Sequence, residues 1–160
     1  MVTGPILDCN TACAAIGDLS WHNASIQESL GSNGVLGHIA RAMKAFSNDR
    51  SLQLRASQAI ANASWNNSSN QERFVASGVC NKVVMALSKY HDDREVQCEG
   101  CRAIDNLCWN NKKTSEKLGH MGACKAIVDA MRLFGQSKSL QLQGVRAGKW
   151  AEQCARYITG

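Results

Sequence analysis

The chain has 160 residues, a formal net charge of +5 at pH 7, 44% hydrophobic residues and 6% aromatic residues. These values are typical of one modest domain with a core of its own, and the single Pro and the 19% of charged residues exclude a Pro-rich linker or a disordered chain. No apolar run reaches the roughly 18 residues that a membrane span needs, and the first residues, MVTGPILDCN, lack the pattern of a signal peptide. We therefore expect a cytoplasmic protein, with the nucleus as an alternative, whose eight cysteines are reduced.

Apolar residues spaced three and four apart predict helices along the whole chain. The predicted helical segments, in chain order, are 8–21, two within 24–46, 51–65, 70–78, 79–90, 94–109, 114–122, 123–134 and 138–158. The repeated Asn-Asn pairs at 66–67 and 110–111 are predicted to end one helix and cap the next, and the repeated Gly78 and Gly122 to end the short helices.

The sequence repeats itself every 44 residues. Trp21, Trp65 and Trp109 have this spacing, and residues 52–93 match 96–137 without a gap at 12 identical positions. Small residues recur on one face of the long helices, which predicts that neighbouring long helices approach closely. The Trp column is interpreted as a wedge between adjacent units.

Three helices per unit, the last of them the longest, and segments such as GCRAIDNLCWNN resemble the armadillo repeat over about residues 8–157. The resemblance implies an all-α fold, a right-handed α-solenoid, for which two-helix HEAT repeats are the alternative. The expected single domain, 1–160, comprises a partial repeat 8–50, repeats 51–93 and 94–137, and a C-terminal capping helix 138–158. A cut from a longer solenoid, or an end that stacks on another chain, is the alternative to a cap.

Enzyme chemistry has little support in the sequence. Cys98 and Cys101 form a CxxC pair, but no second pair completes a zinc motif. Cys98 falls in the column of Leu54 and Leu142, which favours packing in the core. The four histidines pair with no nucleophile, and no glycine-rich nucleotide loop is present. We expect no catalytic residue, no metal and no cofactor.

The resemblance instead implies a concave groove lined by the long helices, where an Asn ladder binds the backbone of an extended peptide. The candidate groove residues, taken column by column, are Asp18, Arg55, Gln58, Asn62, Glu99, Arg102, Asn106, Gln143, Arg146 and Trp150. An alternative is that Asn62 and Asn106 only satisfy local backbone groups.

Nuclear-import receptors of this family place Trp where this chain has Gln58 and Arg102, so cation–aromatic slots for a basic peptide are expected to be absent. The predicted function is a non-catalytic protein-interaction scaffold, one subunit of a larger complex, that binds an acidic or mixed-charge protein segment. A helical repeat that binds nucleic acid through the positive charge is the alternative; the lack of a clustered Lys/Arg stripe argues against it.

Overall fold

The computed structural model describes residues 5–143 and 146, and within them the chain is helical with no strand. The helices are α1 Pro5–Ser20, α2 Ala24–Ser32, α3 Val35–Ala45, α4 Arg50–Ser64, α5 Ser68–Ala76, α6 Val79–Lys89, α7 Arg94–Cys108, α8 Lys112–His120 and α9 Ala123–Leu133. Residues 138–143 begin a further helix; the remainder of the capping helix expected at 138–158, apart from residue 146, lies outside the described residues.

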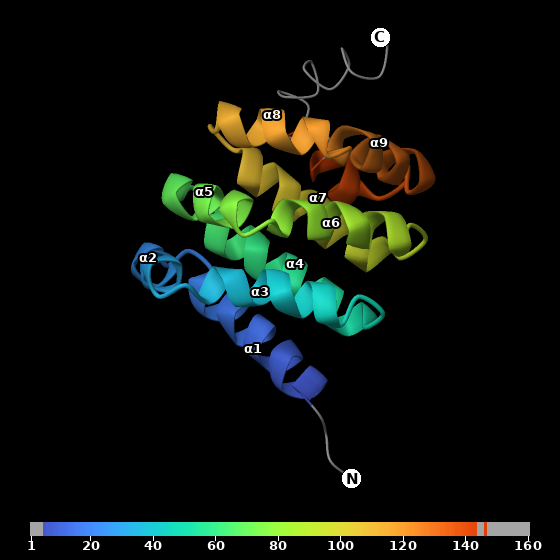
Figure 1. The fold of residues 1–160 in the computed structure, drawn as a ribbon. Coiled ribbons are helices and arrows are strands. Elements are labelled where there is room, and N and C mark those ends of the chain that lie inside the picture. Colours follow the sequence, from blue (N-terminus) through green and yellow to red (C-terminus); the bar gives the residue numbers. More distant parts are fainter. Residues whose placement is uncertain (1–4, 144–145, 147–160) are drawn as a thin grey trace.

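The helices form two layers that climb together from the N-terminal to the C-terminal end (Figure 1). The long helices α1, α4 and α7 pack side by side in one layer, while α3, α6 and α9 form the other with the short helices α2, α5 and α8 at one edge. Equivalent helices begin 44 residues apart, as at Ala24, Ser68 and Lys112. This arrangement confirms the all-α solenoid that the period predicts.

Helix ends follow from local sequence, as predicted for the Asn-Asn pairs. Asn66 and Asn110 adopt positive φ angles of 49° and 51°, a left-handed conformation that Asn tolerates and that ends the long helix. The next residue of each pair caps the short helix, since the Asn67 side chain accepts a hydrogen bond from the Asn70 N–H and Asn111 accepts one from Thr114. His22 and Asn23 occupy the same two positions in the first unit.

A glycine separates each short helix from the helix that follows it. Gly34, Gly78 and Gly122 have φ angles of 71°, 75° and 85°, a region that L-residues with a side chain rarely adopt. The long helices start differently: Asp49 and Asp93 accept hydrogen bonds from the N–H groups of Leu52 and Val96. Gly, Asn and Asp thus determine where most helices end and begin, with His22 and Ser137 in place of Asn and Asp at the two ends of the described chain.

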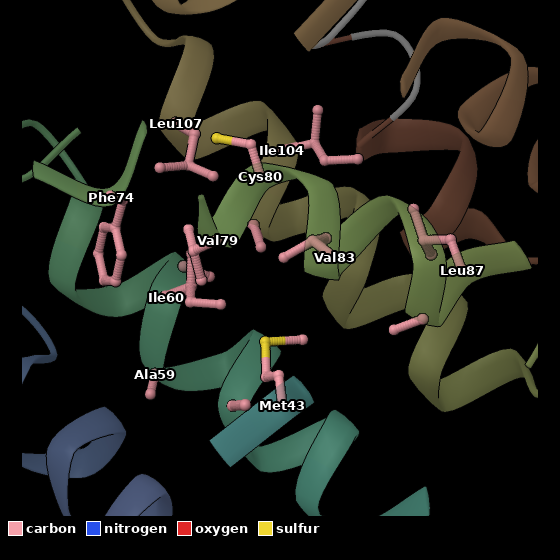
Figure 2. Packing of buried hydrophobic residues seen from close by; sticks show 14 of the residues in the cluster. Met43, Ala59, Ile60, Phe74, Val79, Cys80, Val83, Leu87, Ile104 and Leu107 are labelled. Atoms are coloured by element: carbon pink, nitrogen blue, oxygen red, sulfur yellow. The ribbon is translucent and has the colours of Figure 1, made fainter. Parts of the chain in front are cut away.

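The core lies between the two layers. Phe74, Ile60 and Ile104 are fully buried, and Met43 and Leu87 fill the space beside them (Figure 2). The long helices meet one another through small residues instead; a Cβ on Gly17 would lie 3.5 Å from the backbone of Ala59. This close approach is the one that the small-residue columns predict.

The 44-residue spacing of Gln53, Gln97 and Gln141 has a structural cause. Each Nε2 donates to a carbonyl ten residues earlier, at the end of the preceding helix: Met43 O at 3.1 Å, Leu87 O at 2.7 Å and Met131 O at 2.9 Å. A helix end leaves such carbonyls without an intrahelical partner. The glutamine column therefore ties each long helix to the helix before it.

The glycine corners give a testable prediction. Gly78→Ala should lower the free energy of unfolding by about 1 kcal/mol, because the φ of 75° strains any residue with a Cβ although nothing lies within 4 Å of it. Gly37→Ala, inside α3, is the matched control and should raise it by about 0.5–1 kcal/mol through helix propensity. Urea denaturation followed by circular dichroism measures both; equal effects would contradict the prediction.

Candidate functional site

Most of the predicted site residues share one surface, which we call the long-helix face. Its described members, all with partly or fully exposed side chains, are Asp18, Trp21, Arg55, Gln58, Trp65, Glu99, Arg102, Trp109, Gln143 and Arg146. They recur one helical turn apart along α4, α7 and the helix that begins at residue 138, and at the C-terminal ends of α1, α4 and α7. Of the other predicted residues, Asn62 and Asn106 are buried, and Trp150 lies outside the described residues.

Polar side chains on this face pair within their own helix. Arg55 Nη1 donates to Gln58 Oε1 at 3.1 Å, and the Arg102 guanidinium contacts Glu99 Oε2 at 2.7 and 2.8 Å. Arg55 is exposed, whereas Glu99 and Arg102 are half-buried. The Glu99–Arg102 pair therefore neutralises part of the charge in the middle of the face, and Arg55 keeps its charge free of any carboxylate among the described residues.

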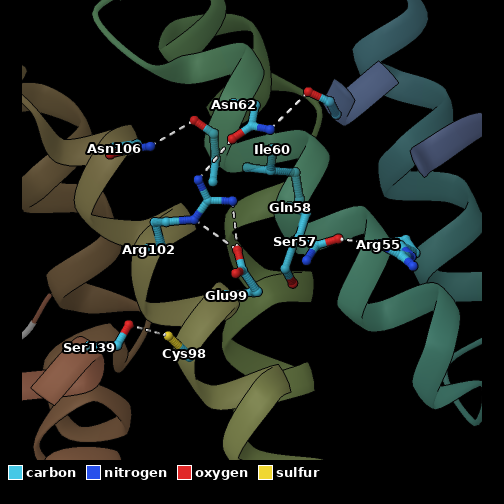
Figure 3. A network of polar contacts seen from close by, with 12 residues as sticks. Arg55, Ser57, Gln58, Ile60, Asn62, Cys98, Glu99, Arg102, Asn106 and Ser139 are labelled. Atoms are coloured by element: carbon cyan, nitrogen blue, oxygen red, sulfur yellow. Dashed lines mark hydrogen bonds and ion pairs between the residues drawn. The ribbon is translucent and has the colours of Figure 1, made fainter. Parts of the chain in front are cut away.

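Asn62 and Asn106 lie beneath the face and are buried (Figure 3). Asn62 Nδ2 donates to Gly17 O and Asn106 Nδ2 to Ala61 O, both at 2.8 Å and both in the preceding unit. The Asn62 oxygen also accepts from Arg102 Nη1 at 2.9 Å. The amides thus satisfy backbone carbonyls, as the alternative had it, but these carbonyls are 45 residues away instead of local, and the amides join successive units.

The tryptophans and arginines of the face stack on one another. The Arg102 guanidinium lies 5.6 Å from the Trp21 ring centroid, and Arg146 lies 5.3 Å from Trp65 and 5.8 Å from Trp109. Trp65 and Trp109 stack across adjacent units with centroids 5.8 Å apart. The expectation that slots for a basic peptide are absent concerned the column of Gln58 and Arg102. The contacts seen here are internal ones, in which arginines of later units reach back over tryptophans in another column.

The comparisons with known proteins agree with this geometry. A family model described as LRRK2 ARM repeat matches residues 8–151. The chain belongs to the LRRK2 ARM repeat family. No curated protein and no solved structure matches it significantly. ARM repeat domains are generally non-catalytic, and membership in this family indicates a helical-repeat module for protein interaction.

The described part of this ARM module shows no clustered reactive groups. In residues 5–143 and 146, no three side chains of His, Cys, Asp or Glu are placed to hold a metal ion, and no helix is long and apolar enough to cross a membrane. Burial raises the pKa of Cys101 to about 12 and raises the pKa of Cys108 further, which keeps both thiols protonated. Cys98, half-buried, has its sulfur 3.0 Å from Ser139 Oγ.

One charged side chain lies buried behind the ARM module's long-helix face. Asp105 is 2% exposed, and its Oδ2 has no hydrogen-bond partner among the described residues and lies 3.6 Å from Arg146 Nε. Burial raises its pKa to about 6, and the positive charge of Arg146 offsets only part of that effect. The neighbouring units have Gly17 and Ala61 in this column, so Asp105 is particular to the third unit.

Asp105 should make stability depend on pH. Its pKa is higher folded than unfolded, so the folded chain binds more protons between about pH 4 and 6, and stability falls as pH rises through this window. Asp105→Ala introduces the residue found at the equivalent position, Ala61. It should reduce the difference in the free energy of unfolding between pH 4.5 and pH 7.5 by about 2 kcal/mol. Urea unfolding at both values measures it; the same pH dependence in variant and wild type would contradict the prediction.

The two buried amides give a second prediction for the ARM module. Asn106→Ala should lower the free energy of unfolding by about 1–3 kcal/mol, because the buried Ala61 carbonyl loses its side-chain donor. Asn81→Ala, at an exposed position of α6, is the control and should change stability by less than about 0.5 kcal/mol. Thermal unfolding followed by calorimetry compares the two variants, and an equal melting temperature would rule out the inter-unit role of Asn106.

Proposed function

We propose that this ARM module is a non-catalytic cytoplasmic scaffold whose long-helix face binds an extended partner segment of acidic or mixed charge. The observation that carries the proposal is the row of tryptophans with arginine guanidiniums stacked on them, repeated from unit to unit. Trp and Arg are the residue types that contribute most to binding energy at protein interfaces. A surface that repeats every unit suits an extended segment, which can contact successive units in turn.

The exposed residues of the long-helix face indicate where a partner would gain most binding energy. Trp21 is 53% exposed; its ring forms a T-shaped pair with His22, with ring centroids 4.4 Å apart, and the Arg102 guanidinium lies over it. Arg55 is exposed, and its guanidinium donates a hydrogen bond to Gln58 Oε1. A carboxylate on the partner would form a charge-assisted pair with Arg55, and an apolar group would cover Trp21.

The buried amides define the mode of binding in this proposal. Asn62 and Asn106 already hold backbone carbonyls of the preceding unit, so they support the face from beneath. Contact with the partner falls to Asp18, Arg55, Gln58 and the Trp–Arg stacks. A basic peptide of the nuclear-import type is disfavoured, because the chain's own arginines already cover the aromatic faces.

Random-peptide display on the immobilised domain tests the proposal. Selected peptides should be enriched in Asp and Glu. Arg55→Glu should lower their binding affinity roughly tenfold through like-charge repulsion. Lys113→Glu, an equal charge change on the exposed surface of α8, is the control and should retain the affinity. Fluorescence anisotropy with the synthesised peptides measures all three proteins.

Two outcomes would refute this function. If Arg55→Glu and Lys113→Glu lower the affinity for the peptides equally, binding depends on net charge alone and not on the long-helix face. If the domain instead binds single-stranded RNA with a steep dependence on salt, the nucleic-acid alternative takes its place.

A further inference from the structure

A groove of about 340 Å³ lies between the C-terminal halves of α3 and α6, and none of its lining residues belongs to the long-helix face. Met43 and Ala86 are buried in its floor, and Met85 is 54% exposed. The thioether of Met is flexible and polarizable, so it adapts to partners of different shape. The groove therefore offers apolar surface to a second molecule.

Positive charge surrounds this groove. Lys44, Lys82 and Lys89 line it, Arg41 lies on the same helix as Lys44, and neither α3 nor α6 contains an acidic residue. Arg41, Lys44 and Lys82 form no ion pair with any described residue, whereas the Lys89 amine donates to Asn48 Oδ1. None of these four cations forms an ion pair among the described residues, so together they leave a local positive field over apolar surface.

The equivalent groove one unit later differs in charge. It lies between α6 and α9 and has a similar volume of about 360 Å³. The column of Met85 holds Asp129 there, and Lys125 Nζ contacts the Asp129 carboxylate at 2.5 Å. Lys82 and Lys89 correspond to Ala126 and Leu133. Of the two grooves, only the α3–α6 groove is lined by unpaired lysines. Its positive charge therefore does not follow from the repeat of the fold.

We propose that the α3–α6 groove is a second docking site, which takes an amphipathic helix of a partner protein with an apolar stripe flanked by acidic residues. The apolar stripe covers Met85 and the floor, and the carboxylates pair with Lys44, Lys82 and Lys89. Unpaired lysines on both sides of the groove favour an acidic partner over a basic or neutral one.

The dimensions of the groove suit a helix. The helices on either side, α3 and α6, each have 11 residues, a length of roughly 16 Å or three turns. A helix laid between them presents residues at i, i+3, i+4 and i+7 to the floor. Side chains four residues apart on its flanks then reach the lysines of both α3 and α6.

A labelled synthetic peptide of about 15 residues, with Leu at i, i+3, i+4 and i+7 and Glu on the flanks, is the probe. The wild-type chain should bind it, and the double variant Lys44→Glu, Lys82→Glu should weaken binding at least tenfold. The same variant should bind a matched peptide with Lys in place of Glu, which the wild type does not bind. Met85→Asp, which copies Asp129, should also weaken the acidic peptide.

The control carries the same number of charge changes elsewhere. Lys113→Glu with Lys125→Glu should leave the affinity unchanged, and so should Arg55→Glu, since neither change touches the groove. If the control double variant loses as much affinity for the acidic peptide as Lys44→Glu, Lys82→Glu does, net charge alone explains the binding, and the proposal is overturned. Binding only to vesicles containing phosphatidylserine would overturn it too, as would a dimer of the chain that Met85→Asp dissociates in sedimentation equilibrium.

Discussion

The close approach of α1, α4 and α7 is the constraint on which the other features of the structure depend. Gly17 packs against the backbone of Ala59, and at this separation a short Asn side chain reaches a main-chain carbonyl of the neighbouring helix. Bulkier residues in these columns would push the helices apart and break the bonds from Asn62 and Asn106. Small residues and buried amides thus act together: the first set the spacing, and the second fix the register between units.

This packing also determines what the long-helix face presents to a partner. Because the amides turn inward, the groups left at the surface are aromatic rings and guanidiniums, with Glu99 holding Arg102 in place. The face therefore differs in chemistry from an open ladder of amides, although it uses the same columns. Asp105, buried against Arg146, adds a charge that Gly17 and Ala61 lack in the neighbouring units. Because its pKa is about 6, the charge beside this end of the face changes with pH near neutrality.

The net charge of +5 is unevenly distributed, and this distribution separates two surfaces. On the long-helix face most cations are paired with carboxylates or stacked on tryptophans, whereas the lysines around the α3–α6 groove lack carboxylate partners. The two surfaces share no residue, although both include residues of α4: Gln53 in the groove, and Arg55 and Gln58 on the face. If both proposed sites are occupied, by segments of one partner or of two, simultaneous binding would raise the overall affinity.

The sequence by itself determined the helices, their ends and the 44-residue period, because these depend on residues within a few positions of one another: Asn66 ends a helix and Gly78 turns the chain through their own backbone preferences. It also placed the candidate residues on one helix face. Only the tertiary structure decided that Asn62 turns inward to Gly17 and that Arg102 crosses a neighbouring helix to reach Trp21. Those contacts join residues 45 or more positions apart, and the distance and orientation between packed helices, which no local pattern encodes, decide which side chains meet.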